Sequence, residues 1–88
     1  MKIGMMWKRD DPKKSWEQSI NDAYKFYTLK YGHEPNVCYL HPRFLEEEEY
    51  LKLVSTFAEK GLSVERVPYV LKDCLWIGVE EKENNNDN

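Results

Sequence analysis

The sequence lacks the features that mark membrane, fibrous and disulfide-stapled proteins. Its longest nearly apolar run, residues 74–79, is far shorter than the roughly 20 residues that span a bilayer. The apolar opening, residues 3–7, is too brief for a signal-peptide core. Two cysteines are too few for the disulfide framework of a small secreted protein. We therefore expect a cytosolic protein with no membrane partner.

A surplus of positive charge is also missing. Lys and Arg total 13 against 16 Asp and Glu, giving a net charge of −3, whereas general nucleic-acid binders carry a basic surplus. Residues 1–43 hold eight basic and five acidic residues (+3), and residues 44–88 hold five and eleven (−6). This asymmetry fits either a basic face for an anionic partner or an acidic helix and tail that contact only solvent.

The residues that are present suffice for one small core. Of the 88 residues, 41% are hydrophobic and 14% aromatic, which is too rich for a disordered chain. The chain is also too short to bury two cores. We expect one α/β domain over residues 1–80. Residues 81–88 carry only charges and amides, which predicts a disordered tail.

Hydrophobic periodicity predicts four strands and two helices in the order β-α-β-α-β-β. The strands are expected over residues 2–7, 36–40, 62–67 and 74–79. Two helices separate the first three strands, so these strands are expected to be parallel. The last strand is expected to pair with the third. The predicted fold is thus a small βαβαββ layered α/β domain, with a mostly parallel sheet and an antiparallel C-terminal hairpin.

The first helix has two candidate starts and one clear end. Pro12 suits a first helical position, and Ser15 with Gln18 forms a capping box further along. Gly32 supplies the left-handed stop. The spacing of its apolar residues predicts that one side is buried. That side comprises Trp16, Ile20, Ala23, Tyr27 and Tyr31.

The second helix is expected over residues 43–60, opened by Pro42 and ended by Gly61. Residues 46–49 are all Glu, and negative charge in the first turns of a helix is favoured by its dipole. The predicted buried side comprises Phe44, Leu51, Val54, Phe57 and Ala58.

Two basic loops form the candidate site. In open α/β sheets, ligands bind beyond the carboxyl ends of parallel strands, and here the loops after the first two strands meet that description. Their cationic and imidazole side chains are Lys8, Arg9, Lys13, Lys14, His41 and Arg43. Such groups beside helix N-termini can form an anion site, or they can be exposed charges on ordinary capped loops. Neither loop has the glycines of a nucleotide-cofactor motif, so no cofactor is expected.

Residue spacing argues against a metal site and against nucleophilic catalysis. Cys38 and His41 are three residues apart on an extended segment, so they point to opposite faces. The Cys and His residues lack the spacings typical of zinc sites. Cys74 lies in an apolar strand, which raises the pKa of a thiol, and both cysteines are expected to be buried and free. No catalytic or metal residue is assigned.

Residues 3–7 and a set of residues around the second strand form a recognisable pattern. The set comprises Tyr31-Gly32, Pro35-Asn36, Cys38 and His41-Pro42. This pattern resembles a group of short uncharacterised bacterial α/β proteins, a resemblance that implies no activity. The element order is also similar to that of Alba-type folds and the C-terminal fold of translation initiation factor 3, which implies a nucleic-acid partner. The acidic second half departs from those basic domains.

The leading hypothesis is a small non-catalytic binding or protein-interaction module. Exposed aromatic residues and a sheet edge would supply its partner surface, including one for self-association. The alternative is a phosphate-directed binder of RNA or nucleotide that uses the two basic loops. A small enzyme with His41 as acid or base is a third hypothesis.

Overall fold

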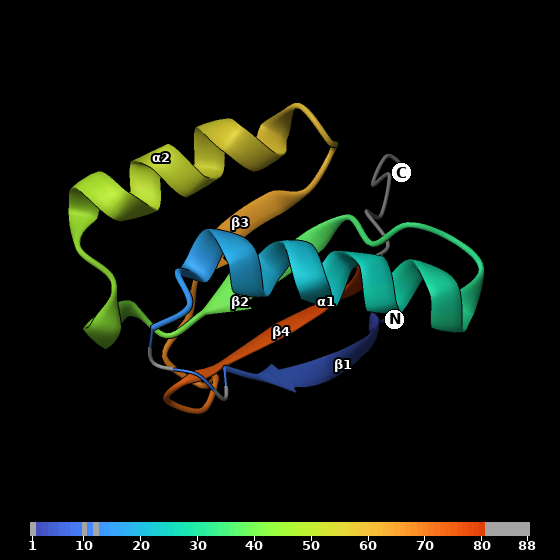
Figure 1. Ribbon diagram of the computed structural model, residues 1–88, viewed down its shortest axis with the longest axis horizontal. Helices are drawn as coiled ribbons and strands as arrows, with labels where there is room; N and C mark the ends of the chain where they lie inside the picture. Colours follow the sequence, from blue (N-terminus) through green and yellow to red (C-terminus); the bar gives the residue numbers. More distant parts are fainter. Residues whose placement is uncertain (1, 10, 12, 81–88) are drawn as a thin grey trace, which may run out of the picture.

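Figure 1 shows the computed structural model, which describes residues 2–9, 11 and 13–80. The predicted tail and the proposed helix start at Pro12 lie outside the described residues. The described elements follow the predicted order. They are β1 (Lys2–Lys8), α1 (Trp16–Tyr31), β2 (Val37–Leu40), a short 3-10 turn η1 (Pro42–Phe44), α2 (Glu47–Ala58), β3 (Ser63–Arg66) and β4 (Cys74–Glu80).

The four strands form one mixed sheet in the order β1-β4-β2-β3. β4 lies between β1 and β2 and is antiparallel to both, while β2 and β3 are parallel. The predicted hairpin of β3 with β4 is wrong, because β2 lies between them. A mostly parallel sheet is not confirmed either, since two of the three pairings are antiparallel.

Burial explains why β4 takes a central position. Leu75 and Ile77 of β4 are fully buried, and a strand this apolar is best covered when it lies inside the sheet. β3 is short and carries Glu65 and Arg66, which suits an edge. Residues 67–73 connect β3 to β4. This connection is long enough to pass the end of β2, which lies between them in the sheet.

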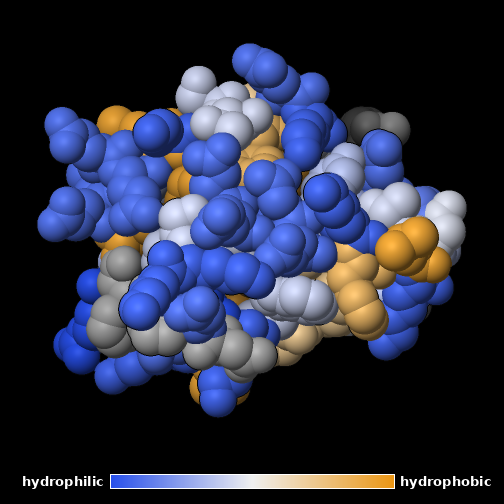
Figure 2. Space-filling view, in the orientation of Figure 1, coloured by the Kyte–Doolittle hydropathy of each residue, from blue (hydrophilic) through white to orange (hydrophobic). Residues whose placement is uncertain are grey.

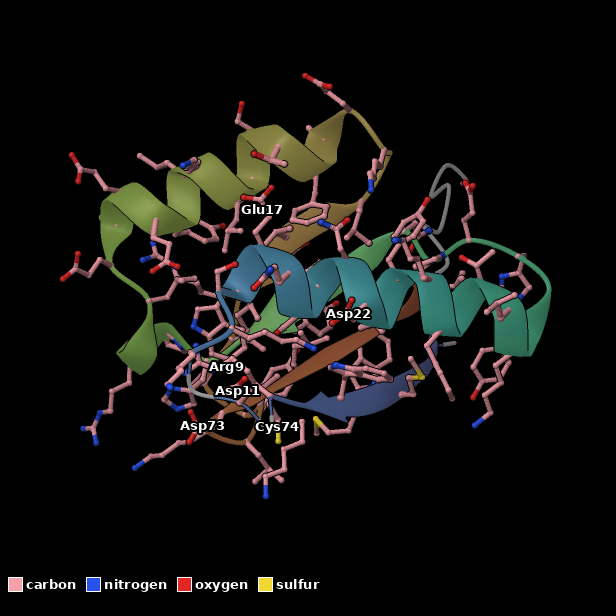
Figure 3. All side chains as sticks on the ribbon, viewed as in Figure 1. Arg9, Asp11, Glu17, Asp22, Asp73 and Cys74 are labelled. Atoms are coloured by element: carbon pink, nitrogen blue, oxygen red, sulfur yellow. The ribbon has the colours of Figure 1, made fainter. Side chains whose placement is uncertain are left out.

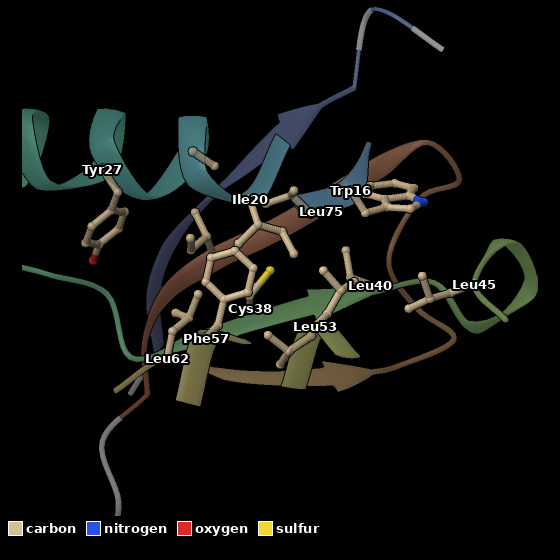
Figure 4. Close-up of a cluster of buried hydrophobic side chains, with 13 residues drawn as sticks. Trp16, Ile20, Tyr27, Cys38, Leu40, Leu45, Leu53, Phe57, Leu62 and Leu75 are labelled. Carbon is tan, nitrogen blue, oxygen red and sulfur yellow. The ribbon is translucent and has the colours of Figure 1, made fainter. Parts of the chain in front are cut away.

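Both helices cover the same face of the sheet, and the core lies between the two layers (Figures 1 and 4). α1 packs over β4, and α2 packs over β3. The largest fully buried side chains include Tyr27, Ile20, Phe57, Leu40, Leu62, Leu75 and Ile77. Each such side chain stabilises the fold by about 1.5–3 kcal/mol through burial. Within the described part of the chain, no helix is long and apolar enough to cross a membrane.

α1 begins at the second of its two predicted starts. The Ser15 hydroxyl accepts a hydrogen bond from the Gln18 backbone N–H at 3.1 Å, and the Gln18 side chain accepts from the Ser15 N–H at 3.4 Å. The helix ends at Gly32, whose φ of 77° is left-handed. The predicted capping box and stop are confirmed. Of the predicted buried side, Trp16, Ile20, Ala23 and Tyr27 are buried, and Tyr31 is partly buried.

α2 is shorter than predicted, because the chain first makes the turn η1 and only then enters the helix after Glu46. The predicted buried side of this helix is confirmed at Phe57 and in part at Val54, and it is wrong at Leu51 and Ala58. Leu53 and Phe57 are buried, whereas the side chain predicted to be buried at Leu51 is 55% exposed. Ala58 is also exposed, and Val54 is partly buried against the core.

Candidate functional site

The helices leave the second face of the sheet uncovered. The strand register places Met6, Trp76, Tyr39 and Glu65 in one row across all four strands. Side chains alternate between the two faces of a sheet, so this row lies opposite the helix-covered core. Only the connection 67–73 lies over this face among the described segments, where buried Val70 packs in a cluster with Tyr39.

Two stacked aromatic rings, Trp76 and Tyr39, form an aromatic platform on the uncovered face. Tyr39 is only 4% exposed, so Trp76 provides most of the accessible ring surface of this pair. Trp76 and Tyr39 stack with ring centroids 5.2 Å apart and planes inclined by 19°. Tyr69, from the connection, stands nearly perpendicular to Tyr39, at 74° and 6.2 Å between centroids. These rings, with Met6, Val70 and Gly4, line a cavity of about 330 Å³. A platform with a perpendicular wall suits a planar ligand.

Gly4 makes room for the indole of Trp76. A Cβ atom at position 4 would lie 2.6 Å from Trp76 Cε2 and 2.7 Å from the backbone oxygen of Ile77. Heavy atoms that are not bonded do not approach so closely, so a glycine is needed where the ring crosses β1. This residue is the reason that the platform lies close to the sheet.

Tyr39 is held in place from the far end of the platform. Its hydroxyl donates a hydrogen bond to Glu80 Oε1 at 2.6 Å. Glu80 is fixed in turn by Asn36, whose side chain donates to the Glu80 carbonyl at 3.2 Å and accepts from the Glu80 N–H at 2.9 Å. Tyr39 is therefore held in place by a residue that is itself anchored to the residue preceding β2.

A second cavity, of about 640 Å³, adjoins the platform and shares Tyr69 and Val70 with it. Its other lining residues are Lys8, His41, Pro68, Leu71, Lys72 and Cys74. The Nδ1 atom of His41 accepts a hydrogen bond from the Arg43 N–H at 3.0 Å. A neutral imidazole in this arrangement carries its proton on Nε2, which is then a hydrogen-bond donor.

The structure brings two of the six predicted site residues into this cavity. β1 and β2 are both antiparallel to β4, so they point the same way and end at the same edge of the sheet. Lys8, the last residue of β1, and His41, which follows β2, line the cavity together. Lys13 and Arg43 are exposed and line neither of these two cavities.

Arg9 and Lys14 contact acidic residues instead. The Arg9 guanidinium lies 3.5 Å from the Asp73 carboxylate and 4.4 Å from the centre of the Trp16 ring. Figure 3 shows Arg9, Asp73 and Cys74 at the same end of the sheet. Lys14 Nζ lies 2.8 Å from the Asp22 carboxylate. Arg9 thus ties the loop after β1 to the start of β4.

Trp76, Tyr39 and Tyr69 are not among the site residues predicted from the sequence. All three lie in or beside apolar segments, which predict core positions. The alternation within β4 does predict that Trp76 lies opposite Leu75 and Ile77, and the structure confirms this. To assign these residues to a site, one must also know that both helices cover the same face of the sheet and leave the other uncovered.

The two cysteines are free and buried, as expected, but they lie on opposite faces. Cys38 is fully buried in the core beneath the helices, and burial raises the pKa of its thiol well above the ordinary value. Cys74 is 8% exposed and lines the second cavity with His41. The described residues contain no group of three or more His, Cys, Asp or Glu that could hold a metal ion.

We expect iodoacetamide to alkylate Cys74 faster than Cys38 in the folded protein. Only a thiolate reacts, and Cys38 is sealed in the core with a raised pKa, so its reaction requires unfolding. Raising the pH through the ordinary thiol pKa of about 8.5 favours the unfolded chain, which loses the Cys38 proton while the folded chain keeps it. The free energy of unfolding should therefore fall as the pH rises. Mass spectrometry of the C38S and C74S variants assigns the alkylation rate of each remaining thiol. Equal rates at both thiols would contradict this arrangement.

A comparison of this chain with known protein families, curated proteins and solved structures found no match.

Proposed function

We propose that this protein is a small non-catalytic binding module whose binding site is the uncovered face of the sheet. The observation that supports the proposal most is the pair of adjoining cavities on that face. Their volumes fall within the roughly 300–1,000 Å³ typical of small-molecule sites. The first cavity also has the aromatic lining typical of such sites, and the second adds the polar groups of Lys8, His41 and Lys72.

An NMR screen with small aromatic and anionic fragments tests this proposal. Binding fragments should shift the backbone amide signals of Met6, Tyr39, Tyr69 and Trp76. Signals of α2, which lies on the other side of the sheet, should stay in place. Fragments that shift mainly helix signals, or a library with no hits on the uncovered face, would overturn the proposal.

A second candidate function, self-association, is favoured by the exposed side of β1 and α1. β1 is an edge strand, so the backbone groups along its outer side can pair with a second copy. Beside it, Phe26 and Leu29 of α1 are 47% and 86% exposed, and Phe26 contacts Trp7 with ring centroids 5.3 Å apart. Figure 2 shows apolar side chains gathered over the C-terminal half of α1. The other edge, β3, is short and charged.

Replacing Leu29 with Glu should convert a dimer of this kind to a monomer. The change places a charge in the apolar side that a second copy would cover. Leu51→Glu is the matched control, since Leu51 is also exposed but lies on α2. Multi-angle light scattering should report a dimer for the wild type and the control. A wild-type monomer at every concentration, or a dimer that Leu29→Glu leaves intact, would contradict self-association here.

A further inference from the structure

The chemistry of the uncovered face changes from one end to the other. Its middle is the aromatic platform of Trp76 and Tyr39, and half-buried Trp76 lines the first cavity. A nucleobase stacks well on such a surface, because every base presents a flat π-face. Tyr69 stands as a wall at the side of the platform.

One end of the face is cationic. Lys8 is exposed and follows Met6 by two residues on the same side of β1, so it is a diagonal neighbour of Trp76 across the β1–β4 pairing. The cavity that Lys8 lines adjoins the cavity that Trp76 lines, since the two share Tyr69 and Val70, so a ligand that occupies both can place one end near each residue. Lys72 and His41 line the same cavity as Lys8, and none of the described residues that line it is acidic.

The acidic side chains of this face lie at its β3 edge and at the end opposite Lys8. Glu65 stands in the platform row on β3, and Glu80 accepts the hydrogen bond from Tyr39. These carboxylates repel further phosphates, so a polyanion that follows the whole face is disfavoured. The charges therefore complement a ligand with one phosphate-bearing end and one aromatic end.

We propose that the uncovered face binds a nucleoside monophosphate, with the base stacked on Trp76 and the phosphate held by Lys8. This inference rests on the proposed function. His41 and Lys72 line the same cavity as Lys8. Tyr69, which is 68% exposed and lines the same cavity as Trp76, borders the base from the side.

Isothermal titration with AMP, adenosine and inorganic phosphate separates the two halves of the ligand. AMP should bind about tenfold more tightly than adenosine, since a hydrogen bond to a charged group is of that size. Lys8→Ala should remove this advantage and leave adenosine binding unchanged. Lys52→Ala, an exposed lysine on α2, is the matched control and should bind AMP as the wild type does.

Replacing Trp76 with Leu should weaken AMP and adenosine together, by about fivefold or more, since stacking on the indole is lost. Trp76→Phe keeps a flat ring and should retain part of the binding. If Trp76→Leu does not fold, Trp76→Phe still tests whether binding depends on the ring. Equal AMP binding by the wild type and Lys8→Ala would overturn the proposal, as would AMP binding that does not depend on the ring.

Two further outcomes separate this inference from the proposed function. If aromatic fragments bind the uncovered face but AMP does not, the nucleotide assignment is wrong and the binding face stands. If neither binds there, both are wrong. If a single-stranded RNA octamer binds much more tightly than AMP, the ligand is a single-stranded nucleic acid and not a mononucleotide. That result would overturn the inference.

Discussion

Replacing Leu53 with Ala is expected to lower the free energy of unfolding by about 2–5 kcal/mol, because the change leaves a cavity in the core. Leu53 is 3% exposed and belongs to the cluster beneath α2. Small domains are stable by only about 5–15 kcal/mol, so a loss of this size lowers the urea concentration at the midpoint of unfolding by a large fraction. Urea denaturation followed by circular dichroism measures it.

Leu51→Ala is the matched control for that experiment. Leu51 lies two residues away on the same helix, yet it is 55% exposed, so its truncation should change stability by no more than about 0.5 kcal/mol. Periodicity alone predicts the reverse, with Leu51 in the core. A larger loss for Leu51→Ala than for Leu53→Ala would mean that α2 presents its other side to the sheet.

Replacing Gly4 with Ala is expected to destabilise the fold by about 1–3 kcal/mol, the usual cost of overpacking. The new methyl group would press on Trp76 and on the backbone oxygen of Ile77. The indole can move, but the backbone of a central strand yields little. The displaced ring should also change the fluorescence of the protein and weaken AMP binding.

A double-mutant cycle with Trp76→Ala isolates the part of that loss due to the ring. Without the indole, Gly4→Ala should cost less, and what remains reports the contact with the Ile77 oxygen. An unchanged cost in the Trp76→Ala background would contradict the proposed role of Gly4. So would a neutral Gly4→Ala in the wild type.

The local elements were predictable because their signals are short-range. Gly32 predicted the end of α1, and the Ser15–Gln18 capping box was one of the two candidate starts, the one at which the helix begins. The alternation in β4 assigned Leu75 and Ile77 to one face. The start of α2 was not predictable in the same way, since Pro42 opens a 3-10 turn rather than the helix itself.

The strand order was not predictable from neighbouring residues. The predicted hairpin rested on β3 and β4 being consecutive in the sequence, and the seven-residue connection between them is long enough for β4 to pair elsewhere. The partners of β4 are instead decided by burial. Apolar β4 lies inside the sheet with Leu75 and Ile77 fully buried, while charged β3 takes the edge.

The candidate site was predictable at one end only. Lys8 and His41 were expected at the carboxyl ends of their strands, and the structure places both in one cavity. The platform of Trp76 and Tyr39 was missed, since apolar sequence does not reveal which face the helices leave uncovered. Gly4, which weakens the strand pattern, was the one local sign of a ring lying across β1.

The position of Trp76 between Met6 and Tyr39 on the uncovered face decides both the fold and the site. Nuclear Overhauser contacts of the Trp76 ring protons test that position most directly. They should reach Gly4, Met6 and Tyr39, which come from the strands on either side of β4. Contacts from this ring to side chains of α1 or α2 instead would contradict the strand order, the platform and the proposed binding face together.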